Sequence, residues 1–475
     1  MMSGMDLESV ILRTRGLGNS TYILGSEGEA LVVDPPRDAW RVREILERRG
    51  WRLRNVVETH VHNDYLSGAL ELVASERARI VAPARGRYAF DHRGADDGDD
   101  VEVGSIVLRA RATPGHTREH LAWDVIDQAA DGATPTAVLT GGSLLIGSVG
   151  RTDLLGPDAT EELTRQQFDS LRALASLPDE VAVWPTHGSG SFCAAGPMQD
   201  TPTSTIGAER IANPLFALSD PAAFHDRLVS GFMPYPTYYR EMASLNRAGP
   251  VVLGERPRMA ALDPTAVAAA VADGARIVDG RPRTEIATGH IPGSLTVELR
   301  DTFASYVGWI LPVGTPLVLV LPETPGASDE AVDQLVRIGF DRIVGVLDGG
   351  IERWVAEGRP VAEISTMRAA ALADEVRSGA RPAIVDVRDE AEMRDDGRLD
   401  DAFEIPLAEL IGGGPLALVP GSEVTVACKS GARATVAAGL LEARGHRVRL
   451  VPRGGIQDVV RDLAVGESVS EPGKA

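Results

Sequence analysis

The chain has 475 residues, of which 44% are hydrophobic and 24% are charged, values typical of a folded globular protein rather than a disordered or fibrous one. Its 48 basic and 68 acidic side chains give a net charge of -20, which disfavours binding to nucleic acid or to an anionic membrane surface. At roughly 150 residues per domain, the length predicts about three domains. The only cysteines are Cys193 and Cys428, which excludes a disulfide framework.

The first ten residues lack the basic and apolar pattern of a secretory signal. No apolar run reaches the roughly 18 residues that a membrane-spanning helix needs. We therefore expect a soluble, cytoplasmic protein.

Short β-rich runs alternate with polar turns in the first third of the chain. They lie at Ser9–Leu12, Thr21–Leu24, Ala30–Val33, Arg54–Thr59, Ile80–Ala82, Ser105–Ala110 and Ala137–Leu139. With a helical stretch at Ala39–Arg49, they predict an α/β layered fold whose strand ends carry the polar groups. From His187 to Gly254 the pattern becomes irregular and rich in Pro, Ser and Gly, which indicates a connector packed on the first domain.

An internal repeat follows this connector. Ala275–Arg281 resembles Pro382–Arg388 at an offset of 107 residues, and Gly349–Ile351 resembles Gly454–Ile456 at an offset of 105. Each copy has the pattern strand, loop, strand, helix, strand, which predicts a small parallel α/β domain.

Histidines gather where strands are expected to end. His60 and His62 follow the run Arg54–Thr59, and the two-residue period of an extended chain lets both point to one side, as two ligands of one metal require. Asp64 is close enough to accept a ring N–H or to bind the metal itself. His116 and His187 lie in two further turns, so the pattern favours a metal site over unrelated loop histidines. His120 is expected to cap or pack a turn.

The segments Thr59–Tyr65, Thr113–Thr117 and Thr140–Asp153 together resemble the metallo-β-lactamase superfamily, and most closely its persulfide dioxygenase and glyoxalase II-like branch that is fused to rhodanese domains. The resemblance implies an αββα sandwich over residues 1–254. It also implies two tandem rhodanese-like α/β domains with parallel sheets, over residues 255–365 and 366–475. In that branch the iron ligands would include His60 and His116.

Two positions depart from the family pattern. Tyr65 stands where His-x-His-x-Asp-His ends in histidine, which removes a ligand of two-metal hydrolases. Gly142 stands where a Thr-Gly-Asp turn supplies the carboxylate that bridges two metals or completes the iron site. We expect one metal ion at most.

The expected metal ligands are His60, His62 and His116. Additional candidates, as ligands or as supporting groups, are Asp64, Tyr65, Asp153 and His187. One Fe(II) per chain is the first expectation, zinc is the alternative because imidazole suits both, and a metal-free domain is the third.

Cys428 begins a loop between the expected strand Glu423–Ala427 and the helical run Thr435–Arg444. Backbone N–H groups and the positive helix end at such a turn stabilise a thiolate, so Cys428 is the candidate nucleophile and persulfide carrier. The expected substrate-binding loop is Lys429, Ser430, Gly431 and Ala432, with Arg433 as an oxyanion ligand. The alternative is a buried structural cysteine.

The first repeat has no cysteine in the corresponding segment, Leu321–Ala327, and is expected to be catalytically silent. Cys193 is expected to be a connector thiol without a chemical role.

The resemblance implies an enzyme of sulfane-sulfur metabolism that oxidises a thiol persulfide to sulfite at the altered metal site and transfers sulfur through Cys428. The alternatives are a sulfurtransferase with a metal-free N-terminal domain, a mononuclear zinc thioesterase similar to glyoxalase II, and a non-catalytic sulfur sensor or scaffold. The expected partners are a thiol persulfide, thiosulfate or sulfite, and a second copy of the chain.

Overall fold

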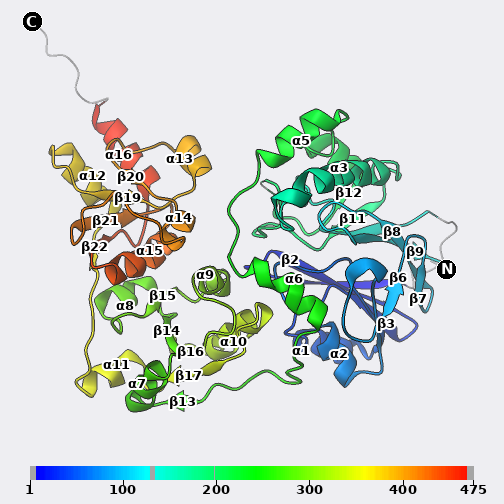
Figure 1. Cartoon of the computed structure of the whole chain (residues 1–475), viewed down its shortest axis with the longest axis horizontal. Coiled ribbons are helices and arrows are strands. Elements are labelled where there is room, and N and C mark those ends of the chain that lie inside the picture. The colour runs from blue at the N-terminus through cyan, green and yellow to red at the C-terminus, as the bar shows by residue number, and fades with distance from the viewer. Residues whose placement is uncertain (1–6, 129–133, 197, 468–475) are drawn as a thin grey trace, which may run out of the picture. The chain divides into compact units, whose positions relative to one another are not determined.

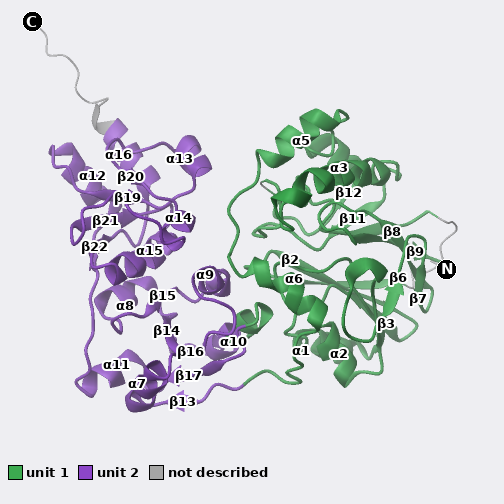
Figure 2. Cartoon of the chain, in the orientation of Figure 1, with its two compact units in different colours: residues 1–257, 332–339 green, residues 258–331, 340–475 purple. Residues whose placement is uncertain are grey.

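The computed structural model describes residues 7–128, 134–196 and 198–467. These residues divide into two compact units, one of residues 1–257 with 332–339 and one of residues 258–331 with 340–475 (Figure 2). Each unit is built on two β-sheets. No helix within the described ranges is long and apolar enough to cross a membrane.

The first unit contains two six-stranded sheets. The first has its strands in sequence order, β1 (Glu8–Thr14), β2 (Asn19–Ser26), β3 (Glu29–Val33), β4 (Arg52–Val57), β5 (Arg79–Pro83) and β6 (Arg93–Ala95). The second runs in reverse order, from β12 (Ser204–Thr205) through β11 (Ala182–Pro185), β10 (Ala137–Gly141), β9 (Leu121–Asp127) and β8 (Ile106–Ala112) to β7 (Asp100–Val103).

The main core of this unit lies between the two sheets, where alternate residues of both meet in one buried apolar cluster that includes Tyr22, Val33, Leu108 and Trp123. Helices cover the outer faces (Figure 1). They are α1 (Trp40–Arg49) and α2 (Ala69–Ser75) on the first sheet, and α3 (Pro157–Leu174), α4 (Ile206–Ala212) and α5 (Pro221–Val229) on the second. This helix–sheet–sheet–helix layering confirms the predicted αββα sandwich.

The expected irregular connector after His187 contains β12, α4, α5 and a further helix, α6 (Tyr239–Ala248). Its apolar residues Ile206, Phe216 and Phe224 join the cluster on the second sheet. The segment is therefore packed on the first domain, as predicted.

The second unit contains two five-stranded parallel sheets with the same strand order. The first is β13 (Ala261–Leu262), β17 (Ile343–Leu347), β16 (Leu317–Val320), β14 (Arg276–Asp279) and β15 (Leu295–Thr296). The second is β18 (Ser365–Thr366), β22 (Arg447–Leu450), β21 (Glu423–Ala427), β19 (Ile384–Asp386) and β20 (Phe403–Glu404).

Helices connect the parallel strands of both repeats. Those of the first repeat are α7 (Pro264–Ala272), α8 (Arg283–Thr288), α9 (Phe303–Ile310), α10 (Ala327–Arg337) and α11 (Gly350–Ala356). Those of the second are α12 (Ala369–Arg377), α13 (Glu390–Asp396), α14 (Leu407–Ile411), α15 (Ala432–Ala443) and α16 (Ile456–Glu467).

A buried ion pair is repeated at the equivalent strand end of each copy. Arg281 pairs with Asp279 after β14, and Arg388 pairs with Asp386 after β19. Each arginine also donates to a backbone carbonyl 2.7 Å away, that of Gly289 or Gly397. The shared pair and strand order confirm the predicted tandem repeat of parallel α/β domains.

Candidate functional sites

Four histidines from three separate segments meet at one edge of the N-terminal sandwich. His60 and His62 follow β4, His116 lies between β8 and β9, and His187 follows β11. All four are buried. The ring of His60 lies 4.3 Å from that of His62, 5.0 Å from that of His116 and 5.3 Å from that of His187, measured between centroids. Parallel pairing of β3 with β4 and of β10 with β11 brings these strand ends together.

Hydrogen bonds from Nδ1 orient the rings of His116 and His187. His116 Nδ1 lies 2.8 Å from the Arg151 carbonyl and His187 Nδ1 lies 3.1 Å from Asn19 Oδ1, so in both rings Nδ1 must donate. Their Nε2 atoms therefore carry lone pairs. His116 Nε2 is buried and has no hydrogen-bond partner among the described residues.

His60 is oriented by a short relay of hydrogen bonds. The Thr59 hydroxyl donates to Asp34 and accepts from His60 Nδ1, each over 2.7 Å. His60 Nε2 then faces His187 Nε2 at 3.3 Å. At this distance the two Nε2 atoms can share a proton in a hydrogen bond or bind one metal ion together.

Burial keeps His60 and His116 neutral. It lowers the pKa of His116 to about 3 and the pKa of His60 well below its usual range, and the neighbouring histidines lower both further. Neutral imidazole is the form that binds metals.

His62 has a different environment, because two carboxylates face its ring. Its Nε2 lies 2.9 Å from Glu58 and 3.1 Å from the Tyr65 hydroxyl, while its Nδ1 is buried and unpaired among the described residues. Burial lowers the pKa of His62, but Asp34 and Glu58 outweigh burial and raise that pKa to about 10. A metal at Nδ1 would therefore have to displace a proton from this ring.

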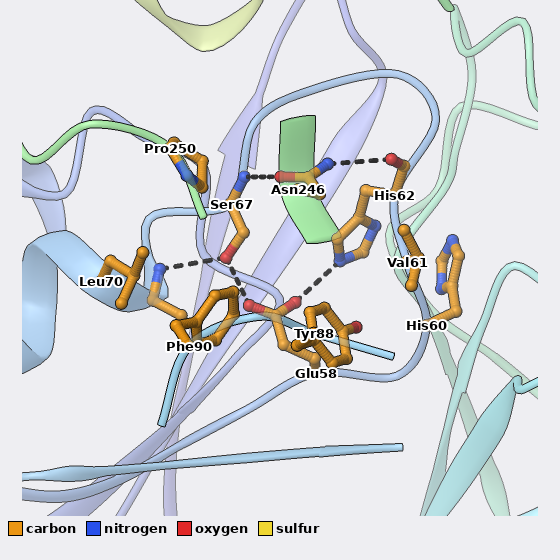
Figure 3. Close-up of a pocket in the computed structure, with 11 residues that line it drawn as sticks. Glu58, His60, Val61, His62, Ser67, Leu70, Tyr88, Phe90, Asn246 and Pro250 are labelled. Atoms are coloured by element: carbon orange, nitrogen blue, oxygen red, sulfur yellow. Dashed lines mark hydrogen bonds and ion pairs between the residues drawn. The ribbon is translucent and has the colours of Figure 1, made fainter. Parts of the chain in front are cut away.

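The carboxylate of Glu58 lines a small pocket together with His60 and His62 (Figure 3). Ser67 donates its hydroxyl proton to Glu58, and the amide of Asn246 donates to the His62 carbonyl over 2.9 Å. Tyr88 and Phe90 complete an apolar lining. This network fixes the backbone and the ring of His62.

The other predicted candidates make the following contacts around the cluster. Asp64 lies 3.3 Å from His187 Nδ1 and holds that ring in its metal-facing orientation. Tyr65 stacks on His62 at 4.3 Å between centroids. Asp153 pairs with Arg151 at 2.7 Å, away from the imidazoles. His120 Nε2 accepts the Gly142 N–H, so its lone pair is already occupied.

Gly142 lies directly against the ring of His116. A Cβ atom at this position would lie 2.2 Å from His116 Cδ2 and 2.8 Å from His116 Nε2. The imidazole thus fills the space in which a side chain at position 142 would begin.

Sequence reasoning assigned no chemistry to Cys193, yet the structure places this thiol beside the cluster. Single ligand atoms of His116, His187 and Cys193 all lie within 4.8 Å of one another, as do those of His60, His62 and His187. Only its position a few residues after His187 pointed to this proximity. Each of these two groups, one of three imidazoles and one of two imidazoles and a thiol, fits a single transition-metal ion.

The second candidate site is the loop between β21 and α15. Cys428 is buried, and its Sγ accepts the Gly431 N–H over 3.1 Å at the start of the helix. Gly431 has a φ of +91°, and a Cβ there would lie 2.1 Å from the Pro452 carbonyl oxygen, so only glycine fits. Ala432 begins the helix.

Cationic side chains surround the mouth of this loop. Arg283, Lys429, Ser430 and Arg453 line a surface pocket there together with Glu298. Arg283 also donates to the Ser430 carbonyl over 2.5 Å and so contacts the loop from the first repeat. Lys429 pairs with Asp396 at 2.8 Å but remains half exposed.

Arg433, the predicted oxyanion ligand, has two carboxylate partners in the structure. It lies 2.5 Å from Glu392 and 3.0 Å from Asp389, both on or next to α13. Its charge is largely compensated, so in this arrangement it ties α15 to α13.

Comparison with known protein families finds a match in each of the two units. Residues 13–187 match the metallo-beta-lactamase superfamily and residues 263–357 match the rhodanese-like domain. The second repeat, which carries Cys428, lies outside the matched residues but has the same strand order.

Two curated relatives cover the N-terminal domain. A hydroxyacylglutathione hydrolase of Methylobacillus flagellatus is 34% identical over 36% of this chain, which spans only 62% of that relative's length. The human mitochondrial persulfide dioxygenase ETHE1 is 30% identical over 42% of this chain and 72% of its own.

A solved structure extends beyond that domain. A metallo-beta-lactamase from Staphylococcus aureus subsp. aureus COL is 26% identical, with a TM-score of 0.64, and the match covers 72% of this chain and 98% of that one. The chain therefore belongs to the metallo-beta-lactamase superfamily and joins that domain to a rhodanese-like region.

Proposed function

We propose that this chain is an enzyme of sulfane-sulfur metabolism in which Cys428 accepts the outer sulfur of thiosulfate or of a thiol persulfide. The observation that carries the proposal is the Gly431 N–H donated to Cys428 Sγ at the start of α15. Amide groups and a helix N-terminus aimed at sulfur stabilise the thiolate, and they can later hold the outer sulfur of a persulfide.

The transfer is a nucleophilic displacement in two steps. The Cys428 thiolate attacks the outer sulfur of thiosulfate, the S–S bond breaks, and sulfite leaves with the bonding electrons. The Cys428 persulfide then passes this sulfur to an acceptor, such as a thiol or cyanide, and the thiolate is restored. The cationic pocket with Lys429, Arg283 and Arg453 suits the dianionic substrate.

For the N-terminal domain we propose persulfide oxidation at one metal ion. The overall reaction converts a thiol persulfide, dioxygen and water into the thiol, sulfite and two protons. His60, His116 and His187 would hold the metal, and the chemistry that Fe(II) would supply there is activation of dioxygen. The relative named as a persulfide dioxygenase supports this assignment.

Asp34, Asp64 and the Arg151 carbonyl act by fixing the tautomers of the three rings. These three supporting groups would orient the rings for any metal-dependent reaction at the cluster. If zinc is bound instead, a thioesterase like the relatives named hydroxyacylglutathione hydrolase is the second candidate, because neutral imidazoles suit zinc equally well.

The sulfur-transfer half is tested with Cys428→Ser in the full chain. Formation of thiocyanate from thiosulfate and cyanide should fall by about 1,000-fold or more, because the hydroxyl cannot carry the sulfur. The matched control is the same substitution at the other cysteine, Cys193→Ser, which should keep this activity. Unchanged thiocyanate formation in Cys428→Ser contradicts the assigned nucleophile.

The oxidation half is tested by elemental analysis of the purified protein together with oxygen consumption on a thiol persulfide. Iron near one per chain with sulfite produced supports the dioxygenase. Zinc with hydrolysis of a glutathione thioester supports the second candidate. Protein that takes up neither metal would be a sulfurtransferase alone.

A further inference from the structure

We propose that Cys193 is a metal ligand together with His116 and His187, so that the N-terminal site is a histidine and thiolate site with His60 beside His187. The proposal deepens the metal-binding half of the proposed function and rests on it. The thiol takes over the anionic ligand that Gly142 cannot supply.

The first argument is the convergence of donor atoms. His116 Nε2 is buried, carries a lone pair and lacks a hydrogen-bond partner within the described ranges. One ligand atom each of His116, His187 and Cys193 lies within 4.8 Å of the other two. An unpaired acceptor buried against a thiol and a second imidazole is costly unless a cation fills the space between them.

The second argument is the spacing of the imidazoles. Two ligands of a tetrahedral ion lie about 1.6 times the metal–ligand distance apart, or about 3.3 Å for imidazole nitrogens on zinc. His60 Nε2 and His187 Nε2 are separated by 3.3 Å. The pair therefore already has the edge length of a four-coordinate site.

The third argument is the shared support of His116 and Cys193. The Arg151 carbonyl accepts the His116 Nδ1–H, and the Arg151 N–H donates to the Cys193 carbonyl over 2.9 Å. The Arg151 side chain also binds the Phe192 carbonyl at 3.1 Å and is clamped by Asp153. One residue thus fixes the ring and the segment that carries the thiol.

The fourth argument is charge. The imidazoles contribute no anionic ligand, and the Asp64 Oδ2 atom is engaged by Asn19 and His187, although its Oδ1 is buried without a hydrogen-bond partner among the described residues. The thiol is buried, and it loses its proton to solvent when it binds a divalent ion, which leaves one negative charge in the first coordination sphere.

Cobalt substitution gives a readout that is independent of activity. Full-length protein loaded with Co²⁺ should show a near-ultraviolet sulfur-to-cobalt charge-transfer band and the visible bands of a four-coordinate ion. Cys193→Ser should lose the charge-transfer band and bind Co²⁺ at least about 100-fold more weakly. Cys428→Ser, the matched control, should keep the band.

A second variant guards against misfolding. Cys193→Asp should regain Co²⁺ binding through a carboxylate without the charge-transfer band, and thermal unfolding should show that both variants are folded. A charge-transfer band that survives in Cys193→Ser, or Co²⁺ bound by the wild type without such a band, would overturn the thiolate ligand while leaving metal binding intact. Absence of Co²⁺ binding in the wild type would overturn both this inference and the metal-dependent half of the proposed function, but not sulfur transfer at Cys428.

Discussion

The two candidate sites are built in opposite ways. In the N-terminal sandwich, side chains from residues 60 to 193 converge, and other buried side chains fix their tautomers. In the last repeat, the sulfur of Cys428 is contacted from within its own loop, by the Gly431 N–H at the start of α15. The first site depends on long-range packing and the second on local backbone geometry.

This difference explains how each site tolerates change. The histidine cluster lacks a carboxylate at position 142, yet its rings are still oriented by contacts with Asp34, Asp64 and Arg151. The cysteine loop depends on a single residue. The first repeat shows this, because it has the same fold and the Asp279–Arg281 ion pair but no cysteine in the corresponding segment.

The largest effect that separates the two sites is expected for His116→Ala. Removing the His116 ring removes the buried Nε2 lone pair that would bind the metal. Metal affinity should therefore fall by at least about 100-fold, while thiocyanate formation stays unchanged. Metal content and sulfur transfer measured on the same preparation check this. A parallel loss of sulfur transfer would show that the two sites depend on each other.

Gly431→Ala is the converse change in the cysteine loop. The left-handed φ of +91° and the Pro452 carbonyl oxygen 2.1 Å from the new Cβ force the loop to move, at a cost of about 2 kcal/mol in stability. Displacement of the Gly431 N–H from Cys428 Sγ should lower sulfur transfer at least tenfold. Metal content should not change, and Gly445→Ala, where no atom lies within 4 Å of the new Cβ, is the control for glycine loss at a positive φ.

Gly142→Asp tests whether the missing family carboxylate can simply be put back. Since the Cβ would lie 2.2 Å from the His116 ring, we expect the substitution to push that ring aside and weaken metal binding about tenfold. Gly142→Ala should act in the same direction, because the collision begins at Cβ. Tighter metal binding by Gly142→Asp would show that the ring yields and that the glycine alone accounts for the altered site.

The sequence predicted the layered fold and the repeat because strands such as Arg54–Thr59 and Glu423–Ala427 are short apolar runs, each followed by a polar turn. It did not reveal β9, Leu121–Asp127, because Asp124 and Asp127 interrupt its apolar run; in the fold Asp124 is buried in an ion pair with Arg111. Nor could it bring Cys193 next to His116, since that proximity depends on Arg151 and on tertiary packing. Local motifs found the cysteine loop, whereas only the fold assembles the full donor set of the histidine cluster.

The smallest effect is expected for Glu392→Gln, which weakens the tie between α13 and α15 beside the cysteine loop. Burial raises the pKa of Glu392, but Arg433 outweighs burial and lowers it below the ordinary 4.5, so the pair stabilises the fold above that pH and loses its effect as pH falls through the lowered pKa. The variant should be less stable by about 1 kcal/mol at pH 7, since the pair is partly exposed, and this difference should shrink below pH 4.5. Glu390→Gln on the exposed face of the same helix is the control, and denaturant unfolding at both pH values is the measurement. A deficit that persists at low pH would mean that Glu392 supports the loop by packing rather than by charge.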